Sequence, residues 1–444
     1  MALKAGAAAQ HSLWARQSVN RTSRSEIQYP AHTIDMPIDH FPSSTRYEPH
    51  TNATFSQRYF YDDSYYKPGG PVFLYIGGET SGEYRFSNLQ TGIIQILMEA
   101  TNGLRVILEN RYYGESYPFA SSTTDELKFL TTEQVCSLNA PNAPWILYGG
   151  SLAGAQTAFS LKTYGGHDGI LWGGIASSGT TKAQLAYVEW CFRGYDPIQE
   201  YGPQDCVGSI NAIVDKIDFV RSTGNATAYI TRTESLERTW ATTPTTSKNH
   251  IVPLCDGTVI ESTACFGTQN ESYRAETSNS GSRSYLYSTC TESGIYQAAR
   301  PYGPSLISRA LQVPYTQQWC TWAFPAGEYN SIPATPELWR YNKYGGYEVV
   351  AERLARIDGE QDVWSDLCYH SSNAPGRVRV TANAEEVEKH PQLLITGAGH
   401  HWDSYGILDV AAEPQFIRGA HRWEIRIVRW LDEWKAKREI GKSK

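Results

Sequence analysis

The stretch "PWILYGGSLAGAQTAF", residues 144–159, decides how the rest of the chain is interpreted. A tight apolar run from Trp145 to Tyr148 meets two glycines, then Ser151, then small residues that lead into an amphipathic segment. This pattern predicts a buried strand, a sharp turn and a helix. Such a turn can hold a nucleophilic hydroxyl above a sheet. It can equally place Ser151 as the N-cap of the helix, and the stretch alone leaves both interpretations open.

Apolar runs on both sides of this stretch predict further buried strands, because continuous hydrophobic runs of this length are typical of strands covered on both faces. They lie at 71–79, 104–114, 169–179, 351–364 and 391–403, while residues 92–100 have the pattern of a helix. A last helix is expected from 414 to about 436, where apolar residues recur with the helical period. Strands that alternate with helices indicate a parallel sheet in an α/β domain.

The character of the chain changes between the two groups of strands. From about 183 to 345 the strand-like runs thin out, and five of the eight cysteines lie between Cys206 and Cys320. This change predicts an inserted, mainly helical cap. The expected organisation is a disordered segment at 1–25, the first part of the α/β domain at 26–182, the cap at 183–345 and the second part of the α/β domain at 346–444.

Composition excludes several classes of function. The 444 residues are 41% hydrophobic and 19% charged, which is typical of a globular protein. The net charge of −7 gives no basic footprint for nucleic acid, and no apolar run approaches the length of a membrane span. The sequence has no P-loop, no HExxH and no CxxC pair, so we expect neither a metal nor an organic cofactor.

Cysteines and glycosylation motifs favour an oxidising compartment. The eight cysteines allow disulfides whose pairing the sequence cannot choose. Four Asn-Xaa-Ser/Thr sequons, at Asn20, Asn52, Asn225 and Asn270, add a little weight to secretion. The first residues lack the apolar core of a signal peptide. We therefore expect a secreted, vacuolar or lysosomal protein whose signal peptide is not evident in this chain.

A nucleophilic serine needs a base to take its proton and an acid to orient that base. In α/β-hydrolases these partners follow in the chain order serine, acid, histidine, each after a late strand. Asp362 lies in "DGEQDVW" (358–364), after the first of the two late runs, and His400 follows the late apolar run "QLLITGA" (392–398). A single aspartate or histidine is usually structural, but the turn, the acid and the histidine in this order together predict a catalytic triad.

The chain resembles the family of lysosomal Pro-Xaa carboxypeptidase and dipeptidyl peptidase II, and within it the fungal secreted proline-specific serine peptidases. The matching motifs run in order over most of the chain: "PIDHF" (37–41), "QRYFYDDSYY" (57–66), "GPVFLYIGGE" (70–79), "NRYYGESYPF" (110–119), "LTTEQ" (130–134), "PWILYGGSLAGA" (144–155), "DGEQDVW" (358–364) and "GAGHHWD" (397–403). The resemblance implies an α/β-hydrolase domain with an inserted helical cap and cleavage next to proline.

Carried over position by position, the resemblance implies that Ser151 is the nucleophile, Asp362 the acid and His400 the base. His401 is then a neighbour that tunes the base. The backbone N–H of Leu152 and one from Gly78 or Glu79 are the expected oxyanion hole.

Two further residues are expected to bind substrate. Trp364 stands where the family pattern also has a tryptophan, and it is the candidate wall of a prolyl pocket. Glu79, in the "GGE" element, is the candidate partner of a substrate's free amino terminus, which would favour dipeptide release. The expected substrates are proline-containing peptides or proteins, and a homodimer is left open.

The chain departs from the family pattern in four places. Leu152, Asn110 and Val363 replace the usual tyrosine, histidine and proline, and none of them removes a triad member. Only nine residues, "VCSLNAPNA", separate "LTTEQ" from "PWILYGG", where relatives carry the body of a helix. The crossover helix is therefore expected from about 123–138, with its end cut off and with lower stability and activity as the consequence.

Two alternatives to a proline-specific peptidase stay open. An esterase or lipase would share the triad, and an inactive or misassembled relative would only bind peptides. The sequence does not decide between endopeptidase, carboxypeptidase and dipeptidyl peptidase action. An acidic working compartment would require a lowered pKa for His400, because the base must be neutral to accept a proton.

Overall fold

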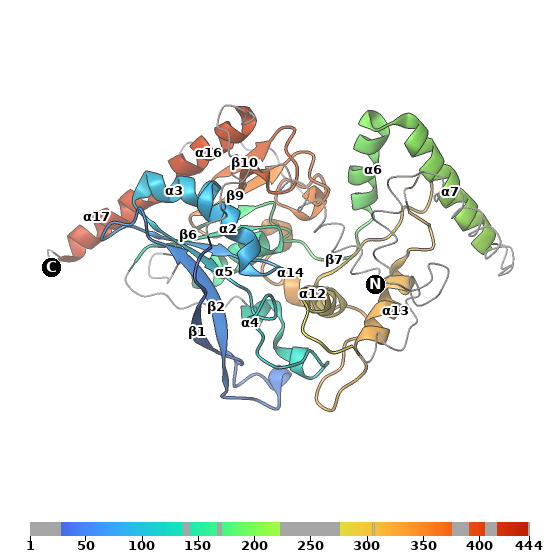
Figure 1. Cartoon of the computed structure of the whole chain (residues 1–444), viewed down its shortest axis with the longest axis horizontal. Helices are drawn as coiled ribbons and strands as arrows, with labels where there is room; N and C mark the ends of the chain where they lie inside the picture. The colour runs from blue at the N-terminus through green and yellow to red at the C-terminus, as the bar shows by residue number, and fades with distance from the viewer. Residues whose placement is uncertain are drawn as a thin grey trace. The chain divides into compact units, whose positions relative to one another are not determined.

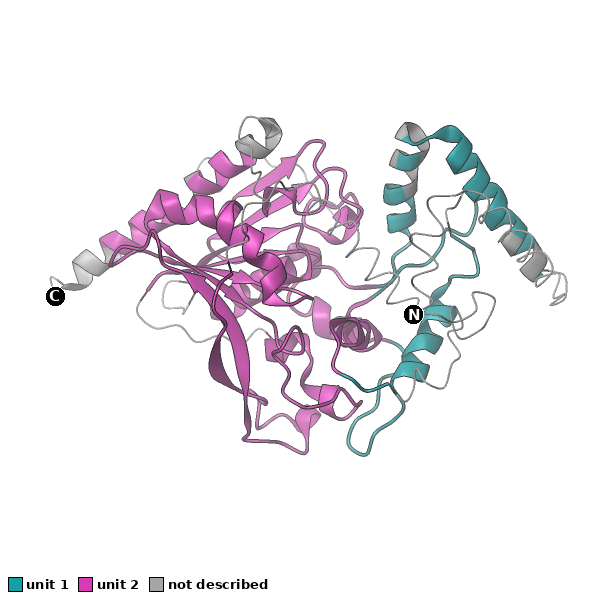
Figure 2. Ribbon diagram, in the orientation of Figure 1, with its two compact units in different colours: residues 1–26, 185–278, 295–335 teal, residues 27–184, 279–294, 336–444 magenta. Residues whose placement is uncertain are grey.

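The structure, a computed structural model, describes residues 28–135, 143–166, 171–222, 276–303, 305, 307–374, 390–404 and 415–442. The chain forms two compact units (Figure 2). Unit 2 comprises residues 27–184, 279–294 and 336–444, and unit 1 comprises residues 1–26, 185–278 and 295–335. Residues 279–294, inside the predicted insertion, thus belong to unit 2. The predicted disordered segment at 1–25 lies outside the described residues.

Unit 2 is built on one eight-stranded sheet. Its strand order is β1-β2-β4-β3-β5-β6-β9-β10. The strands are β1 (His32–Pro37), β2 (Thr54–Asp62), β3 (Val72–Ile76), β4 (Leu104–Leu108), β5 (Trp145–Gly150), β6 (Leu171–Ser177), β9 (Leu354–Gly359) and β10 (Gln392–Ile395). β2 runs antiparallel to β1 and to β4, and all later pairs are parallel. The predicted α/β-hydrolase fold is confirmed, and each predicted apolar run contains a strand.

Helices cover both faces of this sheet (Figure 1). On one face α2 (Phe86–Gln90), α3 (Ile93–Thr101) and α16 (Gln415–Ile427) pack together, and on the other α5 (Leu152–Tyr164) lies against β5 and β6. The two cores follow the alternation of side chains along a strand. Phe73 and Tyr75 of β3 join the core under α3, whereas Leu74 joins the core under α5. Burial on both faces explains why the strands read as continuous apolar runs.

The predicted last helix is wrong in one respect, because it is two helices. α16 ends at Ile427, and α17 (Trp430–Lys442) begins after a turn at residues 428–429. Trp430 is buried, and its carbonyl oxygen accepts a hydrogen bond of 2.8 Å from the indole N–H of Trp172 in β6. This bond ties the first residue of α17 to the sheet directly after the break.

The segment before β5 also differs from the predicted continuous helix at 123–138. A 3₁₀ turn, η3 (Glu126–Phe129), is followed by α4 (Thr132–Val135), and Leu130 and Thr131 interrupt the two. The rest of the predicted helix lies outside the described residues, so the consequence expected from its shortening stays a prediction.

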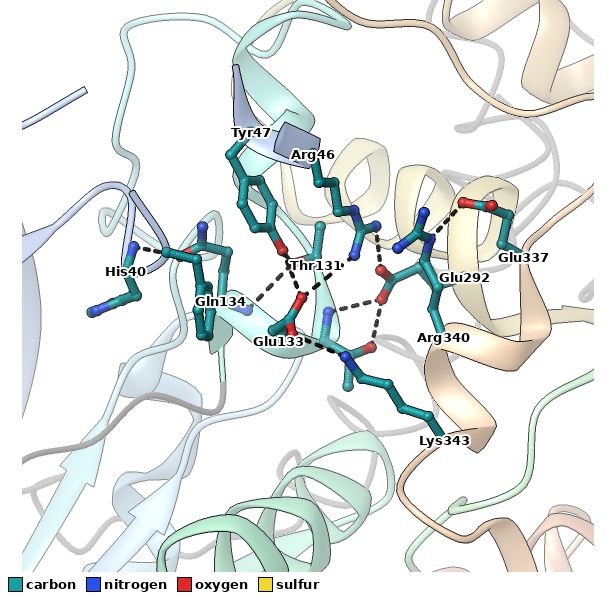
Figure 3. Close-up of polar contacts among 12 residues, drawn as sticks. His40, Arg46, Tyr47, Thr131, Glu133, Gln134, Glu292, Glu337, Arg340 and Lys343 are labelled. Carbon is teal, nitrogen blue, oxygen red and sulfur yellow. Dashed lines mark hydrogen bonds and ion pairs between the residues drawn. The ribbon is translucent and has the colours of Figure 1, made fainter. Parts of the chain in front are cut away.

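Polar contacts anchor the start of α4 (Figure 3). The carboxylate of Glu292 accepts hydrogen bonds from the N–H and the hydroxyl of Thr132, at 2.8 and 2.7 Å. Arg46 pairs with the same carboxylate at 2.5 Å. Glu133 pairs with Lys343 at 3.0 Å. A carboxylate at the helix N-terminus satisfies donors that the helix itself leaves unpaired, so even this short helix has a fixed beginning.

Unit 1 is mainly helical in its described part. It contains α6 (Glu189–Tyr201), α7 (Gln204–Ser222) and α13 (Val313–Ala323). Asp218 of α7 accepts hydrogen bonds from the Ser308 hydroxyl at 2.5 Å and from the Arg309 N–H at 3.0 Å, which ties the loop before α13 to α7.

Cysteine oxidation is visible in the described residues. Cys290 and Cys320 each take part in a disulfide bond, and Cys191, Cys206 and Cys368 are free. Within the described part of the chain, every helix is too short or too polar to cross a bilayer.

Candidate active site

Ser151 lies at the sharp turn between β5 and α5. Its φ is 61° and its ψ is −127°, a backbone conformation that a residue with a side chain adopts only at a cost. Its N–H donates to the Ser177 carbonyl oxygen at 3.0 Å, and its side chain makes no capping hydrogen bond to α5. An N-cap serine would have an extended backbone and a bonded hydroxyl. Ser151 thus stands at the N-cap position of α5 without capping it through its side chain, and its backbone forms the sharp strand-to-helix turn that the sequence predicts.

Small residues around Ser151 permit the close approach of strand and helix. A Cβ atom at Gly149 would lie 2.1 Å from the carbonyl oxygen of Ala153. A Cβ atom at Gly154 would lie 2.8 Å from the Cα of Gly179. Both distances are shorter than any real contact, so the glycines of "GGSLAG" are required by packing against the turn.

Asp362 and His400 meet beyond the carboxyl ends of β9 and β10. The Nδ1 atom of His400 lies 2.7 Å from Oδ2 of Asp362, whose side chain is fully buried. The other carboxylate oxygen of Asp362 accepts a 2.8 Å hydrogen bond from the N–H of Trp364. With Nδ1 bonded to the acid, the imidazole presents Nε2 as the free atom for proton transfer.

The environment of His400 raises the pKa of its imidazole. Burial lowers this pKa, but the charge of Asp362 and its hydrogen bond outweigh burial, and Glu79 acts in the same direction. The expected lowering of the His400 pKa is therefore wrong. The cause is the carboxylate that orients the ring, since an anion beside an imidazole stabilises the protonated form.

A pH profile follows from this shift. The base must be neutral to accept a proton from serine, so kcat/KM should rise with pH and reach half its plateau above the usual histidine value of 6.5. Initial rates on one peptide across pH 4–9 measure this. A half-maximum below 6.5 would contradict the assignment of His400 as a base coupled to Asp362.

His401 is bonded to two neighbouring serines. Its side chain is buried, its N–H donates to the Ser178 hydroxyl at 3.0 Å, and its Nδ1 lies 3.0 Å from the Ser404 hydroxyl. Burial lowers the pKa of His401 well below the usual value, and the charges of neighbouring groups lower it further. A Cβ atom at Gly150 would lie 3.0 Å from its ring. The His400–His401 segment therefore runs beside the elbow that carries Ser151.

The "GGE" element reaches the same region. Gly78 has a positive φ of 75°, and a Cβ atom there would lie 3.7 Å from the Cβ of Ala153 in the first turn of α5. The following residue, Glu79, is half-buried. Burial raises the pKa of Glu79, while the nearby Arg85 and His400 oppose that rise. The loop after β3 thus lies beside the start of α5, where Leu152 is the first helical residue.

Glu109 is a buried residue of this region that the motifs did not single out. Its carboxylate accepts hydrogen bonds from the N–H groups of Gly82 and Glu115 and from the Ser116 hydroxyl, each at 2.8 Å. It also pairs with Arg58 at 2.7 Å. Glu109 immediately precedes the "NRYYGES" motif, and it fixes both this loop and the turn after "GGE". In the sequence, the sign of this role is that Glu109 places a carboxylate inside the predicted apolar run at 104–114.

Trp364 is half-buried and belongs to the loop that holds the acid. Its backbone orients Asp362, as described above, and its carbonyl oxygen accepts a hydrogen bond from the Cys368 thiol at 3.3 Å. Among the described residues no group of histidine, cysteine or acidic side chains could hold a metal ion.

Comparison with known proteins assigns the family. The model of the serine carboxypeptidase S28 family matches residues 37–252 and 252–410. A probable extracellular serine carboxypeptidase of Arthroderma benhamiae is 32% identical over 94% of this chain and 69% of the relative. The lysosomal Pro-X carboxypeptidase of Pongo abelii is 29% identical over 44% of this chain and 41% of the relative. The chain belongs to the S28 family and is a serine peptidase.

Two details qualify these likenesses. The alignment with the Arthroderma protein spans 518 positions, more than the 444 residues of this chain, so the relative has residues with no counterpart here. Among solved structures, a proline iminopeptidase of Mycobacterium smegmatis is 9% identical over 90% of this chain and 99% of that chain, with a TM-score of 0.38. The S28 assignment rests on the sequence matches alone.

Proposed function

We propose that this serine peptidase cleaves on the carboxyl side of proline with Ser151, Asp362 and His400 as its catalytic triad. The observation that carries the proposal is the 2.7 Å contact between His400 and Asp362, beyond the strands whose carboxyl ends lie at the same sheet edge as Ser151. Ser151, Asp362 and His400 follow parallel strands of one sheet in the chain order that α/β-hydrolases use, which supports the proposal.

Each residue of the triad has one task. Nε2 of His400 takes the proton from Ser151 as the hydroxyl oxygen attacks the peptide carbonyl, and an acyl-enzyme forms when the amine leaves with that proton. Asp362 holds the ring in the required tautomer and stabilises the imidazolium. Water then attacks the acyl-enzyme with His400 again as the base. The N–H groups of Leu152 and Gly78 are the proposed donors to the oxyanion.

Specificity for proline is supported by the resemblance and by the position of Trp364. A prolyl residue has no N–H to donate and a fixed φ, so recognition must come from apolar contact. Trp364 is two residues from the acid, its backbone is fixed by Asp362, and its half-buried indole is the proposed wall of the prolyl pocket.

Glu79 is the proposed partner of a substrate's free amino terminus. Its side chain is half-buried and near enough to His400 for the two charges to interact. A cation placed there would lie close to the reacting bond, as removal of a dipeptide requires. Carboxypeptidase and endopeptidase action are the competing modes. Dipeptide release needs a free amino terminus, so comparing peptides with free and acetylated amino termini separates it from both.

The proposed compartment is extracellular or lysosomal. The Arthroderma relative is named as extracellular and the Pongo relative as lysosomal. The disulfide-bonded Cys290 and Cys320 are consistent with an oxidising compartment.

Two matched peptides test the specificity. Replacing proline by alanine immediately before the scissile bond should lower kcat/KM on the order of tenfold or more, since several apolar contacts are lost. A p-nitrophenyl ester of acetate serves as the control for esterase action. Equal rates on the two peptides would remove proline specificity from the proposal, and a rate on the ester alone would favour the esterase alternative.

A further inference from the structure

Two buried acids, Asp403 and Glu424, lie next to the loop that carries His400. Asp403 follows His400 by three residues in the 3₁₀ helix η8 (Trp402–Ser404), and its side chain is 1% exposed. Glu424 lies on α16 and is 0% exposed. α16 packs against η8, and the two carboxyl groups interact with one another. Neither acid belongs to the proposed triad.

Asp403 is tightly bonded to the sheet. Its Oδ1 accepts from the Ser177 hydroxyl at 2.6 Å, and its Oδ2 accepts from the Tyr148 hydroxyl. Its carbonyl oxygen accepts a hydrogen bond of 2.9 Å from Nε2 of His421. Asp403 therefore joins the His400 loop to β5, β6 and α16 at once.

Glu424 has no comparable partners. Both of its carboxylate oxygens are buried, and among the described residues no N–H or hydroxyl group donates to them; the side chain with which Glu424 interacts is that of Asp403. An ionised carboxylate without donors inside a protein is strongly unfavourable, and the usual outcome is that the group stays protonated. Two neighbouring buried carboxyl groups also cannot both ionise without strong repulsion.

The groups that face the pair supply little positive charge. Tyr148 on β5 and Tyr75 on β3 are neutral phenols, with pKa values raised by burial. His421 on α16 donates to the carbonyl oxygen of Asp403, and its charge lowers the pKa of the Asp403 carboxyl group. Arg85 of η2 (Gly82–Arg85) acts on Tyr75 and His401, and the acid of α3, Glu99, is exposed. Neither Arg85 nor His421 acts on the pKa of Glu424.

We propose that Asp403 and Glu424 share a proton, and that this protonated pair holds the loop that carries His400 in its working position. As pH rises and the proton leaves, two buried anions face one another and the loop separates from α16. The pair is thus a positioning device that confines the folded site to acidic and neutral pH. The link to turnover rests on the proposed role of His400, whereas the link to stability does not.

Shifts in the pKa of both groups agree with this geometry. Burial raises the pKa of Glu424 well above its usual value, and Asp403 raises it further. Burial also raises the pKa of Asp403, and hydrogen bonds from Ser177 and Tyr148 offset only part of that rise. A carboxyl group whose pKa is higher in the folded state favours folding at low pH, and this advantage is lost as pH rises above its unfolded value.

Thermal unfolding of three proteins between pH 4 and pH 8 tests the proposal. The wild type should lose Tm as pH rises, and Glu424→Gln, which keeps the shape of a protonated acid, should lose less. At pH 8 the variant should melt on the order of 2–4 °C above the wild type, and at pH 4 the two should coincide. Glu433→Gln on α17, whose side chain is 57% exposed, is the matched control and should follow the wild type.

A parallel pH dependence of Glu424→Gln and wild type would overturn the proposal. If the variant does not fold, infrared spectroscopy of the wild type decides, because a carboxylic-acid carbonyl band at pH 7 supports the shared proton and its absence overturns it. For turnover, the decline of kcat at alkaline pH should move to higher pH in Glu424→Gln with KM unchanged. If Tm shifts as expected but kcat does not, the pair affects only the fold and the positioning role is overturned.

Discussion

Ser151→Ala should abolish nearly all turnover of a proline-containing peptide, with kcat about 10⁶-fold lower, and leave Tm unchanged. Tm should not change because the Ser151 hydroxyl makes no capping bond to α5. His400→Ala should be as damaging, and Asp362→Asn should cost about 10⁴-fold through the wrong tautomer of the imidazole. Steady-state kinetics on purified variants measure these losses.

The double variant and the neighbouring histidine supply the controls. Ser151→Ala combined with His400→Ala should be little worse than Ser151→Ala alone, because triad members act as a unit. His401→Ala should lower Tm because the buried imidazole and its contact with the Ser404 hydroxyl are lost. A His401→Ala protein that folds normally but loses more activity than His400→Ala would show that the base is assigned to the wrong histidine.

Glu109→Ala should destabilise the protein by about 3–5 kcal/mol, because it leaves Arg58 and three further donors without their buried acceptor. Hydrogen bonds from Arg58 and from backbone N–H groups outweigh burial and lower the pKa of Glu109. Its stabilising contribution is therefore present above the usual glutamate value of 4.5 and lost as pH falls through its lowered pKa. Urea denaturation at pH 7 and at pH 3 measures the difference.

The matched control is the other acid that contacts Arg58. Glu83 lies 2.9 Å from Arg58, but its side chain is 55% exposed. Glu83→Ala should therefore cost about 0–1 kcal/mol at pH 7. Equal losses for the two variants would mean that burial of Glu109 does not determine the stability of this region.

Features that depend on local pattern could be predicted from the sequence. The strands were apparent because burial on both faces makes them continuously apolar, and the elbow because its close packing needs glycine at fixed positions. Asp362 and His400 could be found because the fold places them directly after late strands. The chain order suggests that they pair, but the 2.7 Å contact between them is seen only in the folded structure.

Features that depend on partners distant in the chain were missed. The bond from Trp172 that anchors the start of α17 joins residues far apart in the chain, and no periodicity within the helix reveals it. The raised pKa of His400 depends on how close Asp362 lies. Glu424 left a signal, since it falls on the apolar face of its helix between Ala420 and Ile427, where a carboxylate needs a special environment.

The most direct test of the account is covalent labelling of the wild-type protein with a fluorophosphonate, followed by mass spectrometry of its peptides. We predict a single adduct on Ser151 and no adduct in Ser151→Ala or in heat-denatured wild type, because only a hydroxyl activated by His400 attacks the phosphorus. A folded wild-type protein that stays unlabelled, or that carries the adduct on another serine, would contradict the assignment of Ser151 as the nucleophile.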